Sequence, residues 1–317
     1  MFVLSTVRPV DGIMDELRGL FAEADFRFCQ NIDVAMEDLP VADVLVTLGE
    51  DLTPELIERA TNLKWIMVVS AGMEKMPFAA IDERGIFVTN ARGIHKIPMA
   101  EYTFSMILQV AKKNKELYEL EQQKVWDRTA VQTFELHGKT LAILGVGAIG
   151  GEIARIGQAF NLNVIGVNSS GNDQPSIDKM YTMSQLEEVL QEADFVVSIL
   201  PSTKETTYLL TEEHFHQMKS EAIFINIGRG DLVKDEVLVK VMKEQRIAHA
   251  VLDVFENEPL SAEHPFWGMD NVTVTPHISS ITKNYMPRAF DIFKENMKVF
   301  TSGEGTYINL IDLKRGY

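Results

Sequence analysis

The sequence predicts an α/β protein built from two doubly wound parallel-sheet domains with a cleft between them. Short apolar runs alternate with amphipathic stretches along most of the 317 residues, as expected for strands joined by crossover helices. The series of strands also starts again after a long helical stretch over residues 100–123. The alternation predicts the α/β class, and the restart predicts two domains.

The expected elements follow one another in a regular order. Strands are predicted at residues 44–48, 65–69, 86–90, 140–145, 163–168, 195–200, 222–228, 249–255 and 272–276. Helices are predicted at residues 54–61, 149–160, 184–191, 233–245 and 285–301. If the last helix returns to the first unit, one domain covers residues 1–97 and 283–317, and the second covers 98–282.

Composition narrows the classes of function. The chain is 46% hydrophobic and carries a formal net charge of −16, so a phosphate backbone or an anionic lipid surface is not an expected partner. The single cysteine, Cys29, excludes an intrachain disulfide and a thiolate metal cluster. We find no signal-peptide pattern and no run of about 18 apolar residues, so a cytoplasmic protein is expected.

A glycine-rich turn follows the predicted strand 140–145. Gly145, Gly147 and Gly150 form the pattern G-x-G-x-x-G, and a predicted helix begins directly after them. In this setting the glycines allow a tight turn, close approach of a pyrophosphate, and close packing of the helix on the strand. The first helical N–H groups, near Ala148 and Ile149, would face the phosphates. The turn therefore predicts a dinucleotide site.

The next strand ends without the acidic residue that usually binds the ribose of NAD. Asn168, Ser169 and Ser170 stand there, all neutral and able to donate hydrogen bonds to a 2′-phosphate. No Lys or Arg occurs at 169–173, and Asp173 is acidic, so a phosphate grip is not obvious. The sequence favours NADP and leaves NAD possible; the alternative is that these are ordinary turn residues.

Three polar residues follow three later strands. Arg229 lies in NIGRGDLV, Glu258 in DVFENEPL and His277 in TPHISS. Each has a structural explanation when it is taken singly, but the carboxyl ends of parallel strands line one crevice, which would bring the three together.

Their chemistry suits reduction of a 2-oxo acid. Arg229 can hold a carboxylate and polarise the neighbouring ketone, while His277 gives the alcohol its proton. Glu258 would orient the imidazole and favour its protonated form. Asp253, at the end of the strand before Glu258, could accept a hydrogen bond from the nicotinamide carboxamide.

The chain resembles the D-isomer-specific 2-hydroxyacid dehydrogenase family, which includes glyoxylate/hydroxypyruvate reductases. The resemblance runs from about residue 65 to 280 through VVSAGMEKM, GIFVTNARGIHKIPMAEYT, GKTLAILGVGAIG, ILPSTKETTYLL, FINIGRGDLV, DVFENEPL and HPFWGMDNVTVTPHIS. It implies two Rossmann/flavodoxin-like domains, a substrate-binding one (1–97 with 283–317) and a dinucleotide-binding one (98–282). It also implies that Arg229, Glu258 and His277 are the catalytic residues.

The resemblance extends to further site residues and to partners. It implies that backbone N–H groups of Ala71 and Gly72 bind the substrate carboxylate. It implies cofactor contacts from Leu200, Pro201, Ile227, Gly228, Asp253 and Thr103. It also implies a small 2-oxo acid or 2-hydroxy acid as substrate and a homodimer formed through the stretch 100–125.

Two other interpretations fit parts of the sequence. His214 and His216 look like a pair of metal ligands, but residues two apart on a helix point to different sides, so we expect no metal. Some relatives with this fold act as nucleotide-sensing corepressors, which would make the chain a binding module. The presence of Arg229, Glu258 and His277 favours an enzyme.

Overall fold

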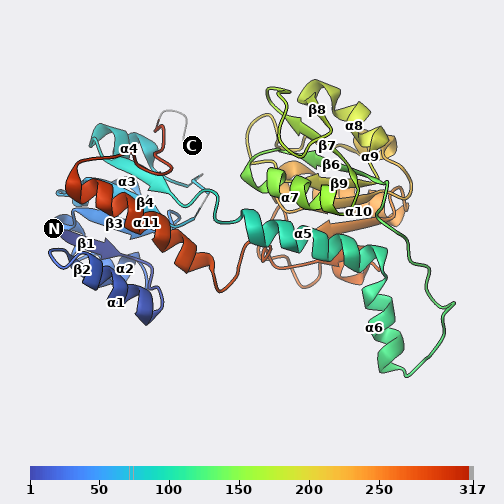
Figure 1. Ribbon diagram of the computed structural model, residues 1–317, viewed down its shortest axis with the longest axis horizontal. Coiled ribbons are helices and arrows are strands. Elements are labelled where there is room, and N and C mark those ends of the chain that lie inside the picture. Colours follow the sequence, from blue (N-terminus) through green and yellow to red (C-terminus); the bar gives the residue numbers. More distant parts are fainter. Residues whose placement is uncertain (71, 74, 314–317) are drawn as a thin grey trace. The chain divides into compact units, whose positions relative to one another are not determined.

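The computed structural model describes residues 1–70, 72–73 and 75–313, and it divides into two compact units. Unit 1 comprises residues 1–94 and 282–317, and unit 2 comprises residues 95–281. The sequence placed these boundaries at 97/98 and 282/283. Each unit is an α/β domain with one parallel sheet, as Figure 1 shows, and each is described below by itself.

Unit 1 contains a five-stranded parallel sheet in the order β2-β1-β3-β4-β5. Its strands are β1 (Phe2–Ser5), β2 (Asp25–Phe28), β3 (Val44–Thr47), β4 (Trp65–Val68) and β5 (Phe87–Asn90). Its helices are α1 (Asp11–Leu20), α2 (Ile32–Ala35), α3 (Pro54–Arg59), α4 (Phe78–Glu83) and α11 (Tyr285–Ser302). The sequence reading missed β1 and β2; β2 alternates polar and apolar residues in a run of only four.

The central strands β3 and β4 are buried on both faces, which explains their continuous apolar runs. Successive side chains point to opposite faces of a strand, so Ile66 packs with α3 and α4 while Trp65 packs with α1 and α11. The ring of Trp65 stacks on Phe293 of α11 at 5.3 Å. The last helix is thus part of the core of unit 1 although it lies 195 or more residues beyond its strands.

Unit 2 contains a seven-stranded parallel sheet in the order β12-β11-β10-β9-β6-β7-β8. Its strands are β6 (Thr140–Leu144), β7 (Asn163–Asn168), β8 (Lys179–Thr182), β9 (Phe195–Ser198), β10 (Ile223–Asn226), β11 (His249–Leu252) and β12 (Val272–Val274). Its helices are α5 (Lys96–Ala111), α6 (Asn114–Gln122), α7 (Ala148–Ala159), α8 (Leu186–Glu192), α9 (Glu212–Gln217) and α10 (Asp235–Lys243). Short 3₁₀ turns lie at Leu39–Val41 in unit 1 and at Met183–Gln185, Gly230–Leu232 and Pro265–Gly268 in unit 2.

The order of strands reverses between β6 and β9, because the chain runs outward from β6 to β8 and then returns to build β9 to β12 on the other side. A reversal of this kind is where doubly wound sheets bind ligands, at the carboxyl ends of the strands. Helices α5 and α7 cover one face of the sheet, and α8, α9 and α10 cover the other. The sequence reading missed β8, a partly buried edge strand.

The long helical stretch expected over 100–123 is two helices. Helix α5 ends at Ala111, and α6 begins after Lys113, whose φ of 56° lies in the left-handed region. No residue of α6 is buried, and Figure 1 shows α6 leading away from the sheet of unit 2. Beyond it, Trp126 is 91% exposed. Through the described parts of the chain, no helix combines the length and apolar character needed to cross a bilayer.

The structure predicts that acid destabilises the contact between β11 and β12. The Nε2 atom of His249 lies 2.9 Å from Thr273 Oγ1, which also accepts a hydrogen bond from Lys115 (3.0 Å). Burial lowers the pKa of His249 to about 4, and the charges of Lys115 and Lys113 act in the same direction. Folding therefore opposes protonation of His249.

We expect stability to fall as the pH drops from about 6.5 to 4, because only the unfolded chain binds the proton readily. The loss should approach about 3 kcal/mol, which is the shift in pKa expressed as free energy. Urea unfolding at pH 7.5 and pH 4.5 measures it, with His249→Asn as the comparison. An equal loss of stability in the wild type and in His249→Asn would contradict the assignment.

Candidate active site

The three glycines of the turn after β6 have separate physical reasons. Gly145 has a φ of +100°, a backbone conformation that residues other than glycine rarely adopt. A Cβ on Gly150 would lie 2.7 Å from the carbonyl oxygen of Gly145, so α7 packs closely on the turn. A Cβ on Gly147, the N-cap of α7, would meet no heavy atom of the described residues within 4 Å, so the space beside this position is open. The turn thus fits a pyrophosphate beside Ala148 and Ile149.

Asn168, at the end of β7, builds the next loop with its side chain. Its Oδ1 atom accepts hydrogen bonds from the backbone N–H groups of Ser170 (3.0 Å) and Gly171 (2.6 Å). Gly171 allows this tight turn through its φ of +67°. With its oxygen bound to the loop, the amide NH₂ of Asn168 is the group it can offer to a ligand. Ser169 and Ser170 lie exposed beside it.

The loops after β9 and β10 lie directly against each other. Leu200 and Pro201 follow β9, while Ile227 and Gly228 follow β10. A Cβ on Gly228 would lie 2.7 Å from the carbonyl oxygen of Leu200, so this contact requires glycine. These four residues therefore stand together on the β9 and β10 side of the strand-order reversal.

Arg229 begins the turn after β10. Asn226 donates a hydrogen bond from Nδ2 to the carbonyl of Arg229 (2.9 Å), and Arg229 Nη1 donates to the carbonyl of Gly228 (2.9 Å). The next residue, Gly230, packs so closely on Phe255 that a Cβ would lie 1.9 Å from its carbonyl carbon. The Arg229 turn and the loop after β11 are therefore fixed against each other.

Glu258 and His277 form a carboxylate–imidazole pair. His277 Nδ1 lies 2.7 Å from Glu258 Oε2, and the other oxygen of Glu258 accepts from the backbone N–H of Phe255 at 3.0 Å. The side chains are 47% and 36% exposed. Because Nδ1 is held by the carboxylate, Nε2 is the ring atom that can exchange a proton with a substrate.

The turn that carries His277 is held by Asp253. This carboxylate is fully buried and accepts hydrogen bonds from Thr275 Oγ1 (2.6 Å) and from the backbone N–H groups of Ile278 and Ser279 (both 2.9 Å). His277 itself has a φ of 51°, in the left-handed region. In the structure the partners of Asp253 are the residues around His277, and its contact with the nicotinamide carboxamide stays a prediction.

Thr275 and Tyr102 belong to the hydrogen-bond network around Asp253, and neither was predicted as a site residue. The hydroxyl groups of Tyr102 on α5 and Thr275 lie 2.6 Å apart. Burial raises the pKa of Tyr102 to about 12, so this phenol stays protonated. The position of Thr275 two residues before His277 could have drawn attention to it. No sequence pattern links Tyr102 to residues more than 170 positions away.

Three further residues were predicted to line the site: Thr103, Gly72 and Ala71. Thr103 is fully buried in α5, where its hydroxyl donates to the carbonyl of Met99 at 2.7 Å, and its contact with the nicotinamide stays a prediction. Gly72 lies in unit 1 after β4, and the Ser70 hydroxyl donates to its carbonyl at 3.1 Å. Ala71 lies outside the described residues.

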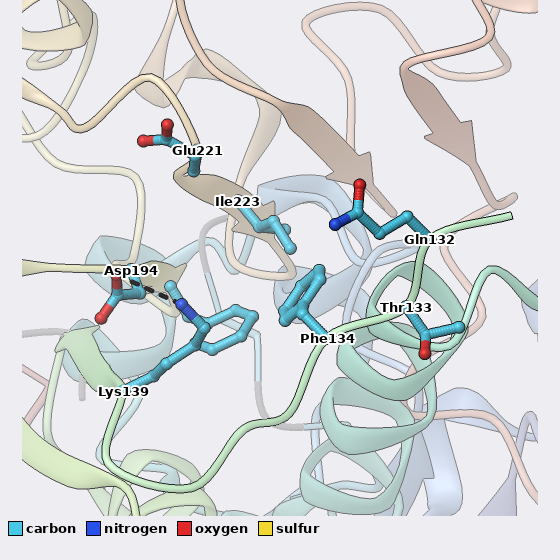
Figure 2. Close-up of a pocket in the computed structure, with 8 residues that line it drawn as sticks. Gln132, Thr133, Phe134, Lys139, Asp194, Glu221 and Ile223 are labelled. Atoms are coloured by element: carbon cyan, nitrogen blue, oxygen red, sulfur yellow. Dashed lines mark ion pairs between the residues drawn. The ribbon is translucent and has the colours of Figure 1, made fainter.

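A cavity of about 310 Å³ lies at the opposite edge of the sheet of unit 2. Figure 2 shows its lining, in which Lys139 pairs with Asp194 at 3.8 Å beside Phe134 and Ile223. Lys139, Asp194 and the neighbouring residues precede or begin β6, β9 and β10 at their amino ends. Since the predicted catalytic residues follow the carboxyl ends of the strands, this cavity is separate from the candidate site.

The two histidines of α9 do not act as a pair. His214 Nδ1 accepts a hydrogen bond from the backbone N–H of Thr211 (3.1 Å). His216 lies with Glu212 and Glu244, and their ligand atoms are within 4.8 Å of one another, a grouping that the sequence did not indicate. Lys240 Nζ, however, lies 2.7 and 2.8 Å from the two oxygens of Glu212 and already neutralises that carboxylate.

Comparisons with known proteins agree with this geometry. Residues 104–279 match the model of the D-isomer specific 2-hydroxyacid dehydrogenase, NAD binding domain. A glyoxylate reductase of Pyrococcus furiosus is 34% identical over 277 residues, which cover 85% of this chain and 82% of the relative. A glyoxylate reductase of Aeropyrum pernix is 34% identical over 271 residues, 83% of this chain and 81% of the relative.

A solved structure agrees with the whole fold. A D-isomer specific 2-hydroxyacid dehydrogenase family protein from Aeromonas salmonicida subsp. salmonicida superposes with a TM-score of 0.86 and 31% identity, covering 98% of both chains. The fold, the glycine turn and these relatives lead to one conclusion. The chain belongs to the D-isomer specific 2-hydroxyacid dehydrogenases and is an NAD(P)-dependent oxidoreductase.

Proposed function

We propose that the enzyme reduces a short 2-oxo acid, such as glyoxylate or hydroxypyruvate, to its D-2-hydroxy acid. The observation that carries this proposal is the 2.7 Å contact between His277 Nδ1 and Glu258 Oε2 beside the Arg229 turn. The substrate class is supported by the relatives named glyoxylate reductase. The substrate-binding role of unit 1, through Ala71 and Gly72 at an interdomain cleft, rests on the resemblance.

Each catalytic residue has a distinct task in this proposal. The bound nicotinamide supplies the hydride that the carbonyl carbon of the substrate receives. Arg229 binds the substrate carboxylate and polarises the ketone oxygen. His277 donates the proton on Nε2 to that oxygen as the alcohol forms, and in the reverse direction it takes the proton back. Glu258 orients the imidazole and balances its positive charge.

For the cofactor, we propose that the enzyme prefers NADP and also accepts NAD. The neutral loop of Asn168, Ser169 and Ser170 supports this proposal, because it lacks the negative charge that would repel a 2′-phosphate. The Asn168 amide oxygen is already bound to the loop, which leaves its NH₂ group as a donor. Pyrophosphate binding would fall to the glycine turn, with Leu200, Pro201, Ile227 and Gly228 nearby.

We also propose a homodimer formed through the helical stretch 100–125. Support comes from the exposed apolar residues that α6 and the segment after it present: Leu117, Tyr118, Val125 and Trp126. Exposed apolar side chains gathered on one segment are typical of an interaction surface.

Replacing both Val125 and Trp126 by aspartate should weaken the dimer, because it puts two charges on this surface. Sedimentation of the wild type and of the double variant measures the fraction of dimer. A monomeric wild type would contradict the proposal.

Replacing His277 by alanine removes the proposed proton donor. We expect kcat to fall by about 100-fold or more, because loss of a general acid has effects of this size. NADPH binding, followed by its fluorescence, should be retained. His216→Ala, an exposed histidine on α9, is the matched control and should keep wild-type turnover. If His277→Ala turns over glyoxylate and hydroxypyruvate at the wild-type rate, the catalytic assignment is wrong.

Replacing Asn168 by aspartate tests the cofactor preference. The carboxylate keeps one oxygen for the N–H groups of Ser170 and Gly171 and presents the other, charged, toward the ribose. We expect the ratio of kcat/KM for NADPH to that for NADH to fall at least about tenfold through charge repulsion. Asn172→Asp adds the same charge four residues later and should change the ratio less. If Asn168→Asp leaves the NADPH/NADH ratio of kcat/KM unchanged, then residue 168 at the end of β7 does not lie beside the cofactor ribose.

A further inference from the structure

The middle of the loop that carries Glu258 has little packing, although Phe255 at its start is buried in the core of unit 2. Asn257, Glu258 and Pro259 are exposed, and Glu258 contacts the backbone of Phe255 within the same loop. A carboxylate on such a loop can hold His277 at 2.7 Å only if the loop is anchored elsewhere. The anchor therefore has to come from residues that the proposed chemistry does not use.

Glu256 provides this anchor. Its Oε2 atom accepts a hydrogen bond from the backbone N–H of Asp235, the first residue of α10. A carboxylate at a helix N-terminus is stabilised by the unpaired N–H groups and by the helix dipole. The same carboxylate raises the pKa of the Tyr208 hydroxyl. Through the Asp235 N–H, Glu256 ties the loop to α10.

The surroundings of Glu256 carry an electrostatic cost. The pKa of Asp235 is raised, by burial first and then by the charge of Glu256. His264 offsets part of this cost with its Nε2 atom 3.4 Å from Asp235 Oδ2, while its Nδ1 accepts from the N–H of Phe266. Two carboxylates placed side by side contribute poorly to stability, and features of this kind are expected where a site needs them.

The anchored loop also reaches Arg229. Phe255 begins the loop, and its backbone packs against Gly230 with no room for a Cβ. Any shift of the loop would therefore move the Arg229 turn as well as Glu258. The contact between Glu256 and the start of α10 therefore acts together with the packing of Phe255 in placing Glu258 and the Arg229 turn.

We propose that Glu256 is a positioning residue, which fixes the loop Phe255–Pro259 so that Glu258 meets His277. It acts through Glu258 and does not touch the substrate or the cofactor. The inference rests on the proposed roles of Glu258 and His277, and its tests separate the two claims.

The first test compares three variants of the loop. Glu256→Ala removes the anchor and should lower kcat about tenfold, a typical effect of displacing a catalytic group slightly. The KM for NADPH should not change. Glu256→Gln keeps a side-chain oxygen for the Asp235 N–H and should recover most of the loss. Asn257→Ala, at the exposed neighbouring position, is the matched control and should behave as wild type.

The second test asks whether Glu256 acts through Glu258. The pH profile of kcat/KM should move to lower pH in Glu256→Ala and in Glu258→Gln, since both leave the imidazole without its carboxylate. The double variant should be no slower than Glu258→Gln alone, which is the non-additivity of residues that act as a unit. The inference is overturned if the pH profile of Glu256→Ala equals that of the wild type and the losses of kcat/KM in the two single variants multiply in the double variant. That result would show that Glu256 has a merely structural role.

The outcomes distinguish the role of Glu258 from the role of Glu256. If Glu258→Gln itself keeps the wild-type rate and profile, the proposed function fails at Glu258. If only Glu256→Ala keeps them, the inference alone fails. Should Glu256→Ala not fold, as judged by its Tm and NADPH binding, Glu256→Asp carries the same tests. Glu256→Asp keeps the negative charge, but its side chain is one methylene too short to reach the Asp235 N–H. A wild-type kcat and a wild-type pH profile in this variant would therefore also reject the positioning role of Glu256.

Discussion

The candidate site depends on one buried carboxylate. Asp253 has no exposed surface, and it accepts three hydrogen bonds from Thr275, Ile278 and Ser279, the residues that flank His277. Burying a charge is costly unless the charged group is fully hydrogen-bonded, so Asp253 needs these three donors. The turn in return needs Asp253, because the carboxylate is what holds its backbone N–H groups in place. The left-handed backbone of His277 is the consequence: the turn bends around the carboxylate and presents the imidazole outward.

A parallel sheet makes this arrangement possible. Residues at the ends of β10, β11 and β12 are held in register, with Asn226 beside Leu252 and Leu252 beside Val274. Whatever follows each strand therefore emerges at the same edge. Asn226 then supports the Arg229 turn, Asp253 supports the His277 turn, and Phe255 supports Glu258. Each proposed catalytic side chain is thus held by a polar group at or just beyond a strand end.

The network divides its acids by environment. Asp253 is buried and engaged with three donors, whereas Glu258 is partly exposed and keeps an oxygen on the imidazole. Glu256 stands between them in the sequence and faces the N-terminus of α10. Three carboxylates within six residues therefore have three different surroundings.

The sequence by itself determined the α/β class, the glycine turn and the order in which Arg229, Glu258 and His277 follow their strands. These features are local: apolar runs, glycine spacing and strand ends are read within a few residues. Tertiary structure alone decided the rest. The edge strands β2 and β8 were missed because short, half-polar runs become strands only beside a partner, and β1 was missed because it is only four residues long. Tyr102, Asp253 and Glu256 acquired their roles from residues brought to them by the fold, and Thr103 proved to be buried in α5. Hydrogen bonds between segments far apart in the sequence depend on where the sheet places those segments. Local sequence patterns do not specify that placement.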